Sequence, residues 1–264
     1  MSSLRGRRVI VTGASSGIGA AVAQQLIDAG AEVTALDRNE PTVAVARYIP
    51  VDLADPASID SAVAQLSGSY DALLNVAGVP GTLPGDVVFA VNFLGMRALT
   101  EAVVPLLPRG GAVVIVSSTA GNGWPARIAA LTELMETTSF EEGAAWFASH
   151  PQEGNAYNFS KEAATVYTQG QGIALLERGI RINAVLPGPV ETPILGDFEE
   201  SMGKDLLDGV RSIVGRHATA QDIAGPVIFL ASDESRWVNG HALAVDGGLT
   251  GGVLAGRLQL TPPN

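Results

Sequence analysis

The sequence predicts one doubly wound α/β domain over residues 1–264, with a mainly parallel seven-stranded sheet and helices on both faces. Short apolar runs alternate with longer helical patterns along the chain. No hairpin signal joins successive runs, and parallel strands need long crossover connections of this kind. With 264 residues and 47% hydrophobic composition, the chain can bury a sizeable core.

The seven expected strands are short runs rich in β-branched and small apolar residues. They are residues 9–11, 33–36, 49–51, 72–74, 112–116, 181–186 and 242–245. Near-continuous apolar runs are typical of strands that are covered on both faces. The third run is the weakest, because Pro50 lacks an N–H group and suits an edge or irregular position.

Helical spacing of apolar residues is found at residues 20–29, 87–107 and 220–231. The first of these helices is expected to end at Gly30, since glycine readily takes the left-handed conformation that terminates a helix. Asp55 and Pro56 predict a further helix start, with an N-cap acid followed by proline at the first position.

Residues 121–153 form a long insertion between the fifth strand and the next helix. A first helix is indicated by apolar residues on one face, namely Ile128, Leu131, Leu134 and Met135. Residues 139–142 then match a capping box, and residues 144–148 continue as a second helix. We predict a two-helix active-site lid; the alternative is a packed surface excursion without function.

Composition excludes several classes of function. The net charge of −11 provides no basic face for nucleic acid or for an anionic membrane surface. Without cysteine there is no disulfide or zinc–thiolate site, and the three histidines are dispersed, so no metal site is predicted. No apolar stretch approaches the about 20 residues of a membrane helix. We therefore expect a cytoplasmic protein.

A glycine-rich turn, Thr-Gly-Ala-Ser-Ser-Gly-Ile-Gly, occupies residues 12–19 between the first strand and its helix. Glycines let the backbone approach a pyrophosphate, and the helix N-terminus offers free N–H groups to the phosphates. This context predicts a Rossmann-type dinucleotide site. Its expected residues are Gly13, Ser15, Ser16, Gly17, Ile18 and Gly19.

The second strand ends in Asp37 and Arg38, near the distance from the glycines at which an acid binds the adenosine ribose. A carboxylate accepts hydrogen bonds from both ribose hydroxyls and repels the 2′-phosphate of NADP. We therefore predict NAD as the cofactor, with Arg38 over the adenine. The alternative is that Asp37 is only a turn residue after a strand.

Further motifs follow in order along residues 6–250. Residues 12–19 fit TGxxxGxG, residues 75–78 stand for NNAG with Val76 at the second position, and residues 157–161 supply YxxxK. Residues 117–118, 187–192 and 245–248 supply the serine pair, the PG…T segment and the DGG segment. As an ordered set, these motifs resemble those of the short-chain dehydrogenase/reductase (SDR) family.

Within that family the chain is similar to coniferyl-alcohol dehydrogenases and, next, to bacterial 3α-hydroxysteroid dehydrogenases. The matching segments are residues 37–39, 77–82, 124–127 and 234–240. Most family members place the catalytic serine about a dozen residues before the tyrosine. Here 39 residues separate Ser118 from Tyr157, which fits this subgroup with its long insertion.

The resemblance implies a catalytic set of Ser118, Tyr157, Lys161 and Asn92. Tyr157 and Lys161 are four residues apart and therefore share a helix face. We expect the Lys161 ammonium to lower the pKa of the phenol, so that Tyr157 takes the alcohol proton as hydride leaves the substrate. Ser118 would hydrogen-bond the substrate oxygen. Asn92 would hold a water in a proton relay, or it is an ordinary polar helix residue.

The resemblance also implies further cofactor contacts. Ile18 and Val190 would flank the nicotinamide, and Thr192 would bind its carboxamide or the phosphates. Asn75 would lie near the adenosine ribose, and Asp52 and Leu53 would contact the adenine. The remaining predicted cofactor residues come from the motifs themselves: Ala77, Gly78, Tyr157, Lys161, Pro187 and Gly188.

The predicted substrate pocket is apolar and partly aromatic. Trp124, Trp146 and Phe147 are candidates to cover an aromatic ring, or they are core residues of the insertion. Leu195 belongs to residues 191–214, which we predict to be a mobile substrate-binding loop because they are rich in charge and glycine.

We predict NAD-dependent oxidation of a cinnamyl- or benzyl-type alcohol, resembling coniferyl alcohol, to its aldehyde. The first alternative is a dehydrogenase or carbonyl reductase for a 3α-hydroxysteroid or another bulky hydroxyl compound. The second is a catalytically silent NAD-binding sensor or scaffold. Partners are expected to be a small-molecule alcohol or carbonyl substrate and copies of the same chain, as a dimer or tetramer. Nucleic acid and membranes are not expected partners.

Overall fold

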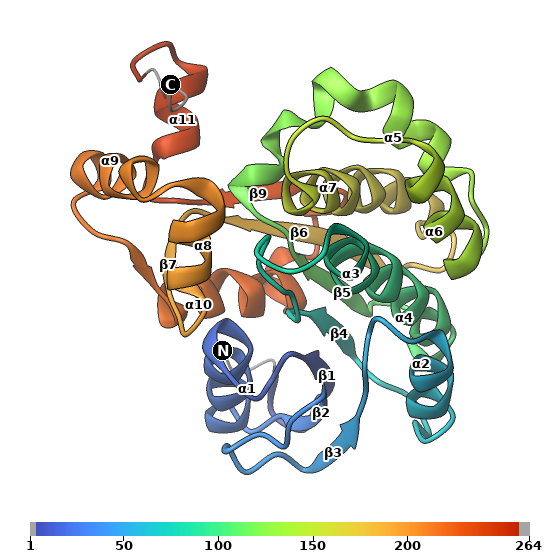
Figure 1. Cartoon of the computed structure of the whole chain (residues 1–264). Helices are drawn as coiled ribbons and strands as arrows, with labels where there is room; N and C mark the ends of the chain where they lie inside the picture. The colour runs from blue at the N-terminus through green and yellow to red at the C-terminus, as the bar shows by residue number, and fades with distance from the viewer. Residues whose placement is uncertain (1–3, 259–264) are drawn as a thin grey trace.

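A computed structural model describes residues 4–258 (Figure 1). Its main sheet has seven strands in the order β3-β2-β1-β4-β5-β6-β9, all parallel. Their bounds are β1 (Arg8–Thr12), β2 (Glu32–Asp37), β3 (Arg47–Pro50), β4 (Ala72–Asn75), β5 (Ala112–Val116), β6 (Arg181–Pro187) and β9 (Ala242–Val245). The predicted doubly wound α/β fold is therefore confirmed, with a sheet that is parallel throughout.

Helices cover both faces of the sheet. The helices α1 (Gly17–Asp28) and α10 (Ala220–Ala231) cover one face; α2 (Pro56–Val63), α4 (Met96–Val103) and α7 (Ala156–Ala174) cover the other (Figure 1). Successive side chains of a strand point to opposite faces. Accordingly, Ile10 of β1 is buried in one apolar core, while Val9 and Val11 are buried in the other.

One helical run corrects the expectation that no apolar stretch has the length of a membrane helix. α3 (Gly85–Phe89), a π-helical turn (Ala90–Gly95), α4 and a 3₁₀ turn (Val104–Leu106) together form a run of 22 residues that contains an 18-residue window with a mean hydropathy of 1.6. Within the protein, 67% of this apolar window is buried. Its buried side packs in the apolar core between the sheet and α7, while Asp86 and Glu101 are exposed on the other side.

The insertion contains the two predicted helices. A 3₁₀ segment (Thr119–Arg127) leads into α5 (Ile128–Met135) and then α6 (Phe140–Ser149). Ser139 caps α6 by accepting a hydrogen bond from the N–H of Glu142 at 3.1 Å. Both helices pack against the α7 and α3–α4 side of the molecule, at the right of Figure 1.

Residues 191–214 are mostly helical rather than a loop. After β7 (Val190–Glu191) come α8 (Leu195–Met202) and α9 (Lys204–Val214), followed by β8 (Ala218–Thr219), which pairs with β7. Charged residues of α9 face outward while Leu207 and Val210 are buried. This amphipathic pattern explains the helix, which the sequence analysis overlooked. α11 (Leu249–Leu254) packs next to α9 (Figure 1).

Candidate active site

A cavity of about 1000 Å³ opens at the carboxyl ends of the central strands. This is where ligands bind in open parallel sheets, and the volume is at the upper end of small-molecule sites. One end is lined by the glycine-rich turn and the ends of β2 and β4; the other is lined by the start of the insertion and by α8, α9 and α11.

The glycine-rich turn has the close packing that a dinucleotide site requires. All six residues predicted from it, Gly13, Ser15, Ser16, Gly17, Ile18 and Gly19, line the cavity. Gly13 has a positive φ of 71°, and a Cβ there would lie 2.7 Å from Cα of Ala77. A Cβ on Gly19 would overlap the carbonyl oxygen of Gly13. Only glycine fits these positions, so backbone rather than side chain faces the cavity where α1 begins.

Asp37 is held beside this turn by two backbone groups. Its Oδ2 accepts from the N–H of Ser15 at 2.9 Å, and its Oδ1 accepts from the N–H of Asn39 at 3.0 Å. Asp37, Arg38, Asp52 and Leu53 all line the cavity, as predicted for residues near the adenosine. The donor and acceptor set at this end therefore fits a dinucleotide.

Asn75 is placed differently from the prediction. It is 3% exposed, does not line the cavity, and donates from Nδ2 to Thr100 Oγ1 at 2.9 Å. Its side chain links the end of β4 to α4 instead of reaching the ribose. The other predicted cofactor residues do line the cavity; they are Ala77, Gly78, Pro187, Gly188, Val190 and Thr192.

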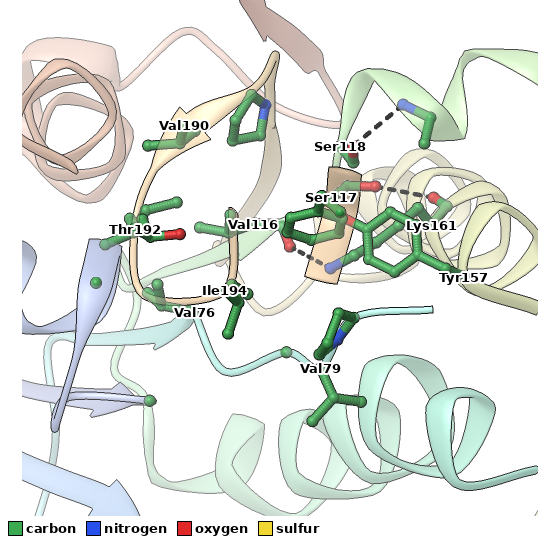
Figure 2. A pocket seen from close by; sticks show the side chains of 18 of the residues that line it. Val76, Val79, Val116, Ser117, Ser118, Tyr157, Lys161, Val190, Thr192 and Ile194 are labelled. Carbon is green, nitrogen blue, oxygen red and sulfur yellow. Dashed lines mark hydrogen bonds between the residues drawn. The ribbon is translucent and has the colours of Figure 1, made fainter. Parts of the chain in front are cut away.

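The predicted catalytic side chains converge from β5 and α7. Tyr157 and Lys161 lie on one face of α7, which begins where Asn155 accepts from the N–H of Tyr157 at 2.7 Å. Lys161 Nζ donates to the carbonyl oxygen of Val116 at 3.1 Å and lies 5.5 Å from the centroid of the Tyr157 ring. Figure 2 shows Ser118, Tyr157 and Lys161 on one side of the cavity and Val190 and Thr192 on the other.

Burial dominates the electrostatics of this group. It raises the pKa of Tyr157 to about 12, although a hydrogen bond with Ser118 opposes the rise. Burial also lowers the pKa of Lys161 to about 8. The predicted net lowering of the phenol's pKa by Lys161 is therefore not found: burial raises this pKa, and the group that opposes the rise is Ser118.

Asn92 lies in the π-helical turn, and its side chain forms two hydrogen bonds with the backbone of Val79. Its Oδ1 accepts from the Val79 N–H at 2.8 Å, and its Nδ2 donates to the Val79 carbonyl at 3.0 Å. Asn92 does not line the cavity, but it lies next to Gly78, where an added Cβ would be 3.3 Å from Oδ1 and 3.5 Å from Lys161 Nζ. Asn92 thus positions the loop after β4; the predicted proton relay stays a prediction.

The two serines at the end of β5 have different roles. Ser117 is 3% exposed and donates from Oγ to the carbonyl of Lys161 at 2.8 Å, which ties β5 to α7. Ser118 Oγ accepts from the N–H of Ala120 at 3.1 Å, and its own O–H is hydrogen-bonded to the Tyr157 hydroxyl. Ser118 is thus the serine in contact with Tyr157, and its role as the catalytic serine stays a prediction.

The substrate end matches the sequence analysis only in part. Trp124 and Leu195 line the cavity. Trp146 and Phe147 do not: Trp146 stacks on His150 with ring centroids 4.4 Å apart, and Phe147 stacks on Phe89 at 4.1 Å. These two rings bury the inner side of α6, as core residues of the insertion.

The lid prediction needs a related correction. Neither α5 nor α6 contributes a residue to the cavity, and only the 3₁₀ segment that starts the insertion reaches it. The cavity is instead covered by α8, α9 and α11. Phe198 of α8 packs edge-on against the Tyr157 ring, with centroids 5.1 Å apart. The sequence analysis missed Phe198 and the residues of α11 that line the cavity. It also missed α9, although the spacing of the apolar residues Leu207 and Val210 could have indicated that helix.

The chain matches known proteins along nearly its whole length. The family model described as short chain dehydrogenase matches residues 7–130, and the model described as Enoyl-(Acyl carrier protein) reductase matches residues 143–250. Coniferyl-alcohol dehydrogenase of Pseudomonas sp. (strain HR199 / DSM 7063) is 41% identical over 248 residues, covering 93% of this chain and 97% of the relative.

Solved structures of dehydrogenases are similar to this chain in fold. The 3-alpha-hydroxysteroid dehydrogenase from Pseudomonas sp. B-0831, complexed with NADH, has a TM-score of 0.79 and 28% identity, covering 96% of this chain and all of that one. Aldohexose dehydrogenase of Thermoplasma acidophilum has a TM-score of 0.75 and 26% identity, covering 100% and 99%. With these matches and the convergent serine, tyrosine and lysine, the chain belongs to the short-chain dehydrogenase/reductase family and is an oxidoreductase of CH–OH groups that uses a nicotinamide cofactor.

Proposed function

We propose that this protein is an NAD-dependent dehydrogenase that oxidises a cinnamyl- or benzyl-type alcohol to its aldehyde. The observation that carries the proposal is the group of Ser118, Tyr157 and Lys161 in a cavity whose substrate end is largely apolar and includes Trp124 and Phe198. The 41% identity to a coniferyl-alcohol dehydrogenase supports an aryl alcohol as the substrate.

The residues divide the chemistry between them. Ser118 donates its hydroxyl to the substrate oxygen and holds it beside Tyr157, whose phenolate form takes the alcohol's proton and becomes the neutral phenol. A bound oxidised nicotinamide supplies the hydride acceptor and an added positive charge in the site. Lys161, anchored to the Val116 carbonyl, provides a second positive charge that stabilises the Tyr157 phenolate before it takes the proton. The surrounding apolar walls exclude water from this step.

Asp37 supports NAD rather than NADP. The carboxylate is oriented by the backbone N–H groups of Ser15 and Asn39, and its charge would repel a ribose 2′-phosphate. Asp37→Ala should therefore raise kcat/KM with NADP at least about tenfold while lowering it with NAD. Glu40→Ala is the matched control, because Glu40 is an exposed acid outside the cavity. An unchanged cofactor preference in Asp37→Ala would overturn this assignment.

The alcohol is tested by steady-state rates of NADH formation with coniferyl alcohol, benzyl alcohol and a 3α-hydroxysteroid. The proposal expects the highest kcat/KM with the first or second compound. A steroid is the second candidate, favoured by the structural similarity to 3-alpha-hydroxysteroid dehydrogenase. Activity on the steroid without activity on any aryl alcohol would reject the first choice. No NADH formation from any alcohol would favour a silent NAD-binding protein.

A further inference from the structure

One charged side chain lies at the substrate end of the cavity. Of the charged residues that line the cavity in the described part of the chain, Asp37, Arg38 and Asp52 are at the dinucleotide end and Lys161 is beside the reacting phenol. The remaining one is Asp197, in the first turn of α8. The walls of the substrate end thus include a single carboxylate and no cation.

α8 also contacts the catalytic group directly. Phe198, the residue after Asp197, packs edge-on against the ring of Tyr157 at 5.1 Å between centroids. Leu195 and Phe198 line the cavity together with Asp197. α8 therefore places Asp197 in the same cavity as Tyr157, one residue before the ring that contacts the phenol.

The carboxylate of Asp197 is incompletely satisfied within the described chain. Its Oδ1 accepts from Thr82 Oγ1 at 3.3 Å, a long bond compared with the about 2.7–2.8 Å usual for O–H···O. Between residues 4 and 258, no other hydrogen bond and no ion pair reaches it. An ionised carboxylate has about four acceptor positions, so Asp197 can accept further hydrogen bonds from a ligand.

We propose that Asp197 determines substrate specificity by accepting a hydrogen bond from a phenolic hydroxyl at the end of the substrate opposite the oxidised carbinol. This inference rests on the proposed oxidation of aryl alcohols. Thr82 is a positioning residue, because its hydroxyl orients the carboxylate across the cavity. The same charge disfavours a substrate that carries a carboxylate in that position, since two like charges would meet with no cation beside them.

The test compares two alcohols that differ in one hydrogen-bond donor: coniferyl alcohol, which has a free 4-hydroxyl, and 3,4-dimethoxycinnamyl alcohol, in which it is methylated. A hydrogen bond to a charged group predicts a kcat/KM about 10- to 100-fold higher for coniferyl alcohol in the wild type. In Asp197→Ala the two values should agree within about threefold. Glu200→Gln is the matched control, because Glu200 is an exposed acid of α8 outside the cavity.

Two further measurements separate charge from hydrogen bonding. 4-Carboxycinnamyl alcohol should be a poor substrate for the wild type and at least about tenfold better for Asp197→Asn, which keeps the shape but removes the charge. Thr82→Val should raise KM for coniferyl alcohol several-fold, with kcat little changed and with no effect on the dimethoxy compound. An effect on both alcohols would indicate a merely structural role for Thr82.

The outcomes distinguish this inference from the proposed function. Equal kcat/KM for the two alcohols in the wild type overturns the role of Asp197 but leaves aryl-alcohol oxidation intact, and this comparison needs no variant to fold. An unchanged ratio in a folded Asp197→Ala protein, checked by thermal unfolding, also overturns it. If the wild type oxidises neither alcohol, the proposed function fails and the inference fails with it.

Discussion

Replacing Lys161 by methionine should make the protein more stable and inactive. Lys161 is 5% exposed, and burial lowers its pKa from 10.5 to about 8. That difference corresponds to about 3 kcal/mol against the charged form at neutral pH. Methionine has similar length and no charge. It loses the hydrogen bond from the charged amine to Val116, worth about 2 kcal/mol, so the free energy of unfolding should rise by about 1 kcal/mol.

The gain should also depend on pH in a defined direction. The folded-state pKa of Lys161 lies below its unfolded value, so between about pH 8 and 10.5 the unfolded wild type binds more protons than the folded one. The cost of burying Lys161 is therefore complete below about pH 8 and disappears as the pH approaches 10.5. The advantage of the variant should shrink over the same range.

Thermal unfolding followed by circular dichroism measures both effects. At about pH 7, Lys161→Met should raise Tm by about 2–4 °C, while turnover falls by orders of magnitude. At about pH 10 the difference in Tm should be mostly gone. The chain's other lysine, Lys204, is exposed, and Lys204→Met is the control with little change. A Lys161→Met protein that is less stable than wild type at neutral pH would refute the reasoning.

Three further outcomes are expected. Tyr157→Phe should lower kcat by about 10²–10⁴-fold with the fold intact by circular dichroism, since it removes the proton acceptor; a near-normal rate would reject the mechanism. Gly13→Ala should weaken NADH binding, measured by fluorescence titration, and lower the free energy of unfolding by at least about 1–2 kcal/mol. The reason is that φ at this position is positive and that an added Cβ would lie too close to Ala77. Wild-type affinity for NADH would contradict this prediction. Trp146→Ala should lower the free energy of unfolding by about 3–5 kcal/mol, because the ring is buried. The order of kcat/KM values among substrates should not change, since the ring lies outside the cavity, and a changed order would show that Trp146 contacts the substrate.

Much of the fold could be predicted from local patterns. Strands such as β5 are continuous apolar runs, and the turn at Gly13 is indicated by its closely spaced glycines. Both can therefore be predicted without any knowledge of distant contacts. α9 was missed because its charged outer face is more conspicuous in the sequence than Leu207 and Val210 on its buried face. The helix over residues 87–107 was predicted, but the apolar length of the Gly85–Leu106 run was underestimated because Arg97 and Glu101 interrupt its apolar residues.

The site was predictable where it follows from ordered motifs, and not where it depends on distant packing. Ser118, Tyr157 and Lys161 converge as expected. Nothing local distinguishes Trp124, which lines the cavity, from Trp146, which is buried behind α6. The predicted cytoplasmic location and homo-oligomeric state stay predictions.

The sequence by itself determined the parallel sheet and the dinucleotide turn, because both depend on residue patterns within single strand–helix units. The catalytic side chains were implied by the resemblance of the ordered motifs to those of the SDR family. Only the tertiary structure decided that α8, rather than α5 or α6, lies over Tyr157, and that Asp197 reaches Thr82 across 115 residues. It also decided the sign of the Tyr157 pKa shift. These properties depend on which surfaces exclude water from one another, and that is settled only when distant segments pack together.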